Sequence, residues 1–172
     1  SYFSSNSLAH LFSSCGFEIY KFAETYEGQF LCLEALPIAG SAPSQHDHRN
    51  DIAKMADEAL AFAERYHDKV ERWRHKLEKI KAAGQRAVVW GGGSKGVTFL
   101  NTLQIQNQIE YVVDINPHKH GKYVAGTGQM IVPPEHLIKY RPDIIVVMNP
   151  IYVEEIARHV KQMNLSTELM TV

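Results

Sequence analysis

The chain has 172 residues, 45% of them hydrophobic, and its 18 basic and 19 acidic side chains leave a net charge of −1 at pH 7. This length suits one ordinary domain, or a small domain plus a fragment, with enough chain to bury a core. The balanced charge excludes a general attraction to nucleic acid or to an anionic membrane, and we find no apolar stretch long enough to span a bilayer.

The first block of the chain, residues 1–37, combines one short helix with two strands. Apolar spacing predicts the helix over residues 7–15. Alternation of apolar and polar side chains predicts strands over residues 17–22 and 29–35. Because a helix and a hairpin cannot enclose a core by themselves, we expect this block to need a partner sheet.

The two cysteines bear on the cellular compartment. Cys15 falls at the end of the predicted helix and Cys32 within the second predicted strand. With only two cysteines and no recognisable signal peptide, we expect reduced, buried thiols in a cytoplasmic protein. The chain begins at Ser1 without a Met and enters structure at once, so we also expect it to be cut from a longer protein.

A linker and one long helix follow. Residues 38–50 are rich in Gly, Ser, Pro and polar side chains, which predicts a linker. The helix is predicted over residues 51–83, with Asn50 as its cap and Gly84 as its stop. Its apolar stripe packs either within the chain, which we favour, or against a second copy as a homodimer. The stripe consists of Ile52, Met55, Ala59, Phe62, Tyr66, Val70, Trp73, Leu77 and Ile80, widened by Leu60 and Ala63.

From residue 84 onward, strand and helix patterns alternate. This alternation predicts an α/β fold in which a parallel sheet is covered by helices. The predicted strands are residues 87–90, 111–113, 144–148 and a short one near Met170. The predicted helices are residues 96–103, 134–139 and 152–163.

A glycine-rich turn joins the first of these strands to its helix. Gly91, Gly93 and Gly96 match G-x-G-x-x-G, and Asp114 follows the next apolar run. In a Rossmann-type βαβ unit, such glycines let the backbone approach a phosphate, which the helix N-terminus attracts. We favour an anion- or nucleotide-binding role for the cluster. The alternatives are a tight turn that needs glycine for its own sake and Ser94 as a simple helix cap.

Four other side chains near this turn have two interpretations each. Lys95 could hold a phosphate as a point charge, or it could be a solvated lysine. Asp114 could hold a ribose hydroxyl, or it could cap the turn that follows it. Lys119 could face a pyrophosphate, or it could belong to a solvated loop. Asn149, at the carboxyl end of a strand, could contact a ligand or form a turn.

The sequence offers no metal or nucleophile site. His46 and His48 stand close together in the predicted linker, but two imidazoles there lack further ligands and a supporting shell. His118 and His120 flank a lysine whose charge disfavours a bound cation. No arrangement of Ser, His, Asp or Cys indicates nucleophilic catalysis, so we assign no catalytic residue and no metal to this chain.

A series of motifs in order resembles the C-terminal region of the S-adenosylmethionine-dependent sugar C-methyltransferase family. The first motifs are the Gly91–Gly96 turn, the helix segment Thr98–Asn101 and the strand ending Val113-Asp114-Ile115-Asn116-Pro117. The later ones are Lys119-His120-Gly121-Lys122-Tyr123, Gly126-Thr127, Pro133-Pro134, Pro142-Asp143, the strand that ends at Asn149 and Glu154-Glu155-Ile156 beyond it. Such an ordered series is far more specific than the glycine turn alone.

This resemblance implies a domain organisation and an activity. Residues 1–37 resemble the tail of a class I methyltransferase core, 38–50 a linker, and 51–172 the long helix plus a Rossmann-like C-terminal domain. The family's Tyr-x-Glu-His motif and methyl-donor site would lie upstream of Ser1, so the chain alone is expected to be inactive.

The implied ligand is a nucleotide-linked keto-sugar on the substrate side of the cleft. S-adenosylmethionine would be bound by the upstream domain. The residues expected to bind the substrate are Gly91, Gly93, Ser94, Lys95, Gly96, Asp114, Lys119 and Asn149. The alternative is a stand-alone Rossmann-type module that binds NAD or CoA.

Overall fold

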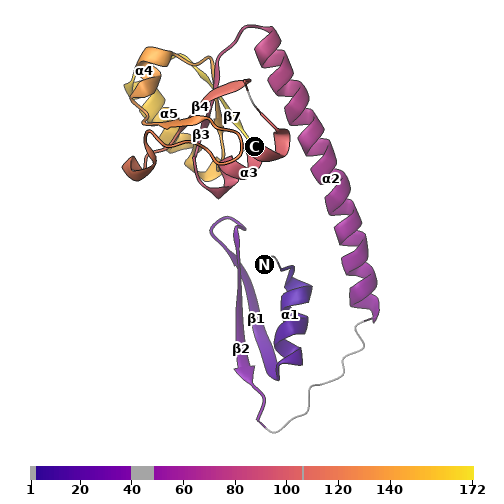
Figure 1. Cartoon of the computed structure of the whole chain (residues 1–172). Helices are drawn as coiled ribbons and strands as arrows, with labels where there is room; N and C mark the ends of the chain where they lie inside the picture. The colour runs from indigo at the N-terminus through magenta and orange to yellow at the C-terminus, as the bar shows by residue number, and fades with distance from the viewer. Residues whose placement is uncertain (1–2, 40–48, 106) are drawn as a thin grey trace. The chain divides into compact units, whose positions relative to one another are not determined.

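The computed structural model of the chain describes residues 3–39, 49–105 and 107–172. The chain divides into two compact units, Ser1–Arg65 and Tyr66–Val172 (Figure 1). Each unit is described below by itself.

The first unit contains helix α1 (Ser5–Ser14) and an antiparallel hairpin of β1 (Phe17–Thr25) and β2 (Phe30–Pro37). Helix α1 begins earlier than the pattern predicts because Ser4 and Ser7 form a capping box. The Ser4 hydroxyl accepts a hydrogen bond from the Ser7 amide at 3.2 Å, and the Ser7 hydroxyl accepts one from the Ser4 amide at 2.9 Å.

No residue between 3 and 39 is buried. The expectation of buried thiols is therefore wrong for both cysteines, which are exposed. Cys32 lies on the outward face of β2, where exposed and half-buried residues alternate, and Cys15 follows the last turn of α1. The physical reason is that one helix and two strands have too few layers to cover both faces of the hairpin.

Helix α2 (Arg49–Ala82) runs for 34 residues. It starts one residue before Asn50, so Asn50 is not the cap, whereas Gly84 follows its end in the left-handed conformation with φ 69°. Among the stripe residues whose side chains are described, from Met55 onward, the buried ones are Trp73, Leu77 and Ile80, all in the second unit. Packing within the chain is confirmed there, but the expectation that Tyr66 is a packing residue is wrong, since it is 44% exposed.

A five-stranded sheet forms the centre of the second unit. All its neighbouring strands are parallel, in the order β5-β4-β3-β6-β7. The strands are β3 (Ala87–Trp90), β4 (Ile109–Val113), β5 (Met130–Val132), β6 (Ile144–Val147) and β7 (Glu168–Thr171). The expected Rossmann-like sheet is confirmed, and the short edge strand β5 is an addition that sequence alternation does not predict.

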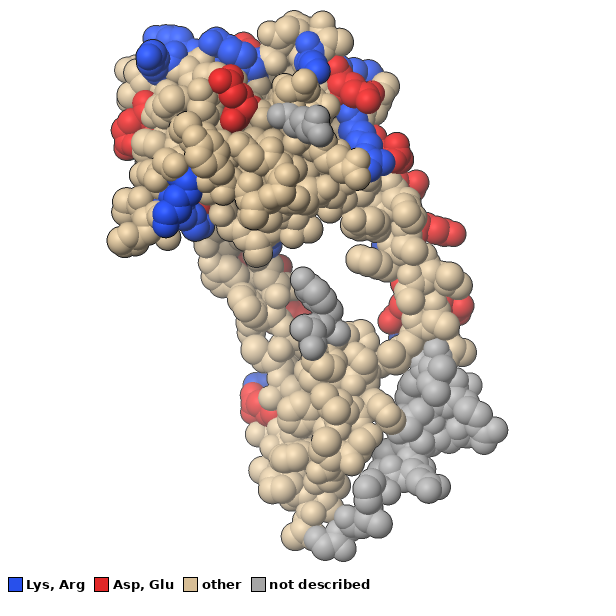
Figure 2. Space-filling view, in the orientation of Figure 1, with Lys and Arg blue, Asp and Glu red and all other residues tan. Residues whose placement is uncertain are grey.

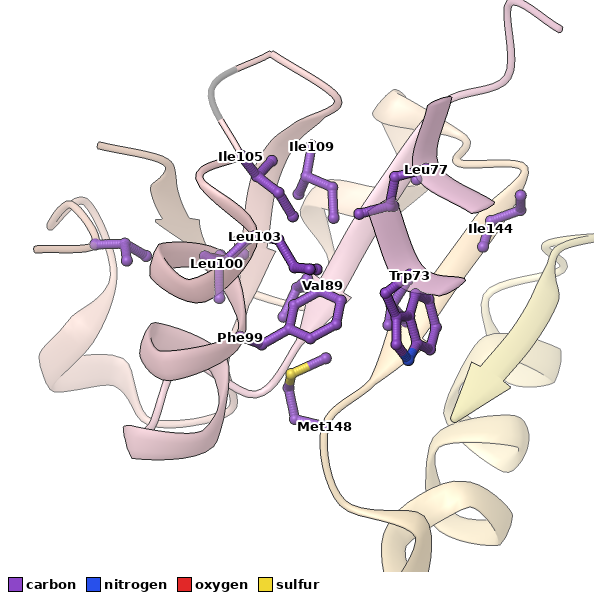
Figure 3. Close-up of a cluster of buried hydrophobic side chains, with 14 of the residues drawn as sticks. Trp73, Leu77, Val89, Phe99, Leu100, Leu103, Ile105, Ile109, Ile144 and Met148 are labelled. Atoms are coloured by element: carbon purple, nitrogen blue, oxygen red, sulfur yellow. The ribbon is translucent and has the colours of Figure 1, made fainter. Parts of the chain in front are cut away.

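Helices cover both faces of this sheet. The helices are α3 (Ser94–Leu103), α4 (His136–Tyr140) and α5 (Val153–Gln162), with short 3-10 turns at Pro117–Lys119 and Pro150–Tyr152. One buried cluster joins α2 and α3 to the sheet, and its Trp73 and Phe99 rings meet edge-on at 5.2 Å (Figure 3). A second cluster joins α4 and α5 to the opposite face.

The alternation along β3 shows why both faces are apolar. Ala87 and Val89 belong to the α2–α3 side, while Val88 and Trp90 belong to the α4–α5 side. Strands buried on both faces are typical of parallel sheets. Among the described residues, no helix combines the length and the apolar character needed to cross a membrane.

Candidate functional site

The order of the strands creates a crevice at the carboxyl ends of the strands. From β3 the chain passes through α3 to β4 and β5 on one side, and then returns through α4 to β6 on the other side of β3. In open α/β sheets, ligands bind outside the carboxyl ends of the strands where the order reverses in this way. A cavity of about 390 Å³ lies at this place, which we call the glycine-turn cavity.

The glycine-turn cavity has two walls. One consists of Gly91, of residues 93–96 at the start of α3, and of Asp114. The other consists of the end of β6 and one face of α5. Its residues include Met148, Asn149, Tyr152, Glu155, Ile156 and His159, with Trp90 at the end of β3.

The three glycines of the fingerprint differ in whether the protein itself requires glycine at that position. Gly91 has φ 121°, a conformation that only glycine adopts readily, and a Cβ there would lie 3.2 Å from the Met148 Cβ. A Cβ on Gly96 would collide with the Gly91 carbonyl oxygen. Gly93 differs from both, because its φ is −89° and a Cβ there would have no atom within 4 Å. The protein itself therefore does not require glycine at position 93.

Helix α3 presents its N-terminus to the cavity. Gly93 is the N-cap, without a side-chain hydrogen bond, so the proposed capping role of Ser94 is wrong: Ser94 is the first helical residue. The first intrahelical hydrogen bond runs from the Val97 amide to the Gly93 carbonyl at 3.0 Å. The amides at the start of an α-helix are not used by the helix's own hydrogen bonds, and they carry the positive end of its dipole.

Asp114 is buried, and its carboxylate holds the glycine turn. One oxygen accepts hydrogen bonds from the Gly92 amide and from Lys119 Nζ, both at 2.9 Å. The other accepts one from the Asn116 amide, also at 2.9 Å. The contact with the Asn116 amide is the turn-capping role considered for Asp114.

The electrostatics of Asp114 favour its charged form. Burial by itself raises the pKa of this carboxyl group, but the hydrogen bond from Lys119 and those from the Asn116 and Gly92 amides outweigh burial. The net effect is a pKa below the ordinary value for aspartate.

Lys119 is held by the same carboxylate. Its ammonium group pairs with Asp114, and it does not line the glycine-turn cavity. His120 supports the same loop, since its Nε2 lies 2.7 Å from the Asp114 carbonyl oxygen. Lys95 and Asn149, in contrast, both line the cavity together with Ser94 and the three glycines.

The face of α5 is the part of the site that sequence reasoning missed. Glu155 and His159 are four residues apart and so share one face of α5, Tyr152 is the N-cap of that helix, and all three line the cavity. The His159 ring lies 6.3 Å from the Trp90 ring at an interplanar angle of 32°. The helical spacing was visible in the sequence, but only the fold shows which face of α5 meets the glycine turn.

Neither a charged patch on the face seen in Figure 2 nor a group of metal ligands marks a further site among the described residues. Figure 2 shows basic and acidic side chains interspersed over the unit that contains α3, α4 and α5. Within residues 3–39, 49–105 and 107–172, no three His, Cys, Asp or Glu side chains are grouped as metal ligands. His46 and His48 lie outside the described residues.

A protein-family comparison matches most of the chain. The model of the C-methyltransferase C-terminal domain matches residues 44–169. No curated protein sequence is significantly similar to the chain.

Several solved structures are similar to part of the chain. RSP, a Rex-family repressor, has 15% identity and a TM-score of 0.41, over 59% of this chain and 60% of the repressor. RSP in complex with beta-NAD+ and operator DNA has 12% identity and a TM-score of 0.40, over 51% and 49%. UDP-D-quinovosamine 4-dehydrogenase from Vibrio fischeri has 19% identity and a TM-score of 0.39, over 51% and 77%. The chain thus spans less than two thirds of the repressor, and these similarities say nothing of its function.

Proposed function

The chain belongs to the C-methyltransferase C-terminal domain family, and we propose that it is the substrate-side part of an S-adenosylmethionine-dependent C-methyltransferase. In this proposal, the substrate is a nucleotide-linked keto-sugar, and the glycine-turn cavity holds its phosphate groups. The methyl donor is bound by a part of the enzyme outside this chain, and residues 3–39 are the closing elements of that part. The chain alone transfers no methyl group.

The observation that carries this proposal is the open space at Gly93. Gly91 is required by its backbone angle and Gly96 by close packing, but nothing in the protein requires glycine at position 93. The residue lines the cavity directly in front of the amides that begin α3. A glycine at such a place lets a phosphate approach the backbone closely, which is the role of the second glycine in this type of turn.

The residues of this chain then have distinct roles toward the substrate. The amides of residues 94–96 donate hydrogen bonds to phosphate oxygens, and the Lys95 ammonium adds a positive charge at the same wall. Asp114 does not contact the phosphate; it fixes the Gly92 amide and so keeps the turn in shape before the ligand arrives. S-adenosylmethionine, when bound, supplies the methyl group that a carbanion beside the keto group accepts.

A stand-alone NAD- or CoA-binding module is the second candidate, because the glycine fingerprint is shared with such proteins. It has less support, since the acidic residue that would hold the adenosine ribose is already engaged by three donors.

Calorimetric titration of the chain separates the two candidates. We expect pyrophosphate, UDP-glucose or dTDP-glucose to bind, and S-adenosylmethionine, NAD and CoA to bind more weakly or not at all. Selective binding of NAD or CoA would replace the proposal with the second candidate. Methyl transfer by residues 1–172 without any other protein would refute the placement of the donor site outside this chain.

A further inference from the structure

The usual carboxylate partner of a bound ribose is engaged elsewhere in this protein. A carboxylate offers about four acceptor positions, and Asp114 uses three of them for Gly92, Asn116 and Lys119. The side chain is also buried on the β4 side of the turn. A ligand that needs an acceptor for its hydroxyl groups must find one on another wall of the cavity.

That other wall contains a second carboxylate. Glu155 lies in the first turn of α5 and lines the glycine-turn cavity, whereas its neighbour Glu154 does not. Ile156 is buried beneath this face and anchors the helix to the sheet. Glu155 therefore stands on an anchored helix, in a wall of the cavity other than the one formed by the start of α3.

His159 extends the same face by one helical turn. Its ring lies beside Trp90, which is only 7% exposed and ends strand β3. The Trp90 ring and Met148 add apolar surface to the cavity. An apolar floor with a carboxylate and an imidazole at its edge suits a sugar ring, whose C–H groups pack on apolar surface while its hydroxyls donate to or accept from polar side chains.

We propose that Glu155 and His159 bind the hydroxyl groups of the sugar ring that is linked to the phosphate held at the glycine turn. The ligand then extends from α3 toward α5, and not toward β4 as a dinucleotide would on Asp114. The inference rests on the proposed function, since it requires a phosphate at the turn. The ring is either the ribose of the nucleotide or the hexose beyond the diphosphate, because both present adjacent hydroxyls.

The test compares Glu155→Gln with Glu154→Gln in the full chain by calorimetric titration. Both variants remove one negative charge from the first turn of α5, but only Glu155 lines the cavity. The probes are pyrophosphate, UDP, dTDP, UDP-glucose and dTDP-glucose. Because Glu155→Gln replaces a hydrogen bond to a charged group by one to a neutral group, it should bind the affected probes about tenfold or more weakly.

The pattern over the probes identifies the ring. If Glu155 binds the hexose, the loss is confined to UDP-glucose and dTDP-glucose. If it binds the ribose diol, the loss occurs with UDP and UDP-glucose, while dTDP and dTDP-glucose, which have no 2′-hydroxyl, are spared. Pyrophosphate should bind Glu155→Gln at least as well as the wild type, since a negative charge has been removed near it.

Two results would overturn the inference. If Glu155→Gln and Glu154→Gln bind every probe alike, or if Glu155→Gln binds all probes more tightly, Glu155 contributes only its charge and the sugar lies elsewhere. If the wild type binds the phosphate probes in either case, the proposed function survives. If the wild type binds none of the five probes, the proposed function fails and this inference fails with it.

Discussion

Replacing Gly93 by serine should stabilise the chain and at the same time weaken phosphate binding. Gly93 is the N-cap of α3, with φ −89° and ψ −167°, and a side chain there meets no protein atom within 4 Å. Serine adopts this extended conformation without strain and is a preferred N-cap residue. The hydroxyl would accept a hydrogen bond from the amide of Lys95 or Gly96, the second and third helical residues.

The two effects have different magnitudes. Serine improves on glycine at an N-cap by a few tenths of a kcal/mol, so the melting temperature should rise by roughly 1–2 °C. The ligand loses one backbone donor to a charged phosphate, which costs about 1.5–3 kcal/mol, or roughly 10- to 150-fold in Kd. The added side chain also fills part of the space that the phosphate would use, which weakens binding further.

Thermal unfolding and calorimetric titration with pyrophosphate measure the two effects on the same preparation. A variant that melts at or above the wild-type temperature but binds at least tenfold more weakly supports a phosphate at the turn. If Gly93→Ser binds pyrophosphate as tightly as the wild type does, the open space at Gly93 has no role in ligand approach. If the variant is strongly destabilised, the account of Gly93 as a position free of packing constraints is wrong.

Four further outcomes follow from the packing and the charges. Gly96→Ala should unfold or severely destabilise the second unit in urea titration, because the new Cβ meets the Gly91 carbonyl oxygen; a wild-type midpoint would contradict this. Asp114 has a lowered pKa in the folded state, so its stabilisation is complete above the unfolded pKa of about 3.9 and is lost as pH falls through the folded pKa. Asp114→Asn should lack that acid-limb dependence, and identical pH profiles for the two proteins would refute the assignment. Trp73→Ala should cost about 3–5 kcal/mol of unfolding free energy, because the ring is 7% exposed and packs on α3; a loss below 1 kcal/mol would show that α2 does not anchor the sheet. Leu60 is 67% exposed on α2, and if this helix forms a homodimer, sedimentation should show a concentration-dependent dimer that Leu60→Glu abolishes, whereas a wild-type monomer at every concentration would exclude the dimer.

Local sequence patterns predicted most strands and helices of the second unit, but not all of them. The apolar runs at β3 and β6 are long enough to be recognised, and Gly84 ends α2 as its position after the last turn suggests. Strand β5 was not predicted, because three residues are too few for alternation to stand out. Its place is decided by pairing with β4, which is a contact between distant parts of the chain.

The glycine turn shows most clearly what the sequence by itself determined and what required the tertiary structure. The spacing of Gly91, Gly93 and Gly96 after an apolar run determined that a strand, a tight turn and a helix follow one another, because these are local constraints on backbone angles and periodicity. Only the fold showed that Asp114 holds the glycine turn, since that contact depends on Gly92 and Lys119 meeting one carboxylate. Only the fold also brought Glu155 and His159 to the cavity. After β5 the chain returns to the other side of β3 and forms β6, and this position of β6 decides which face of α5 lines the cavity.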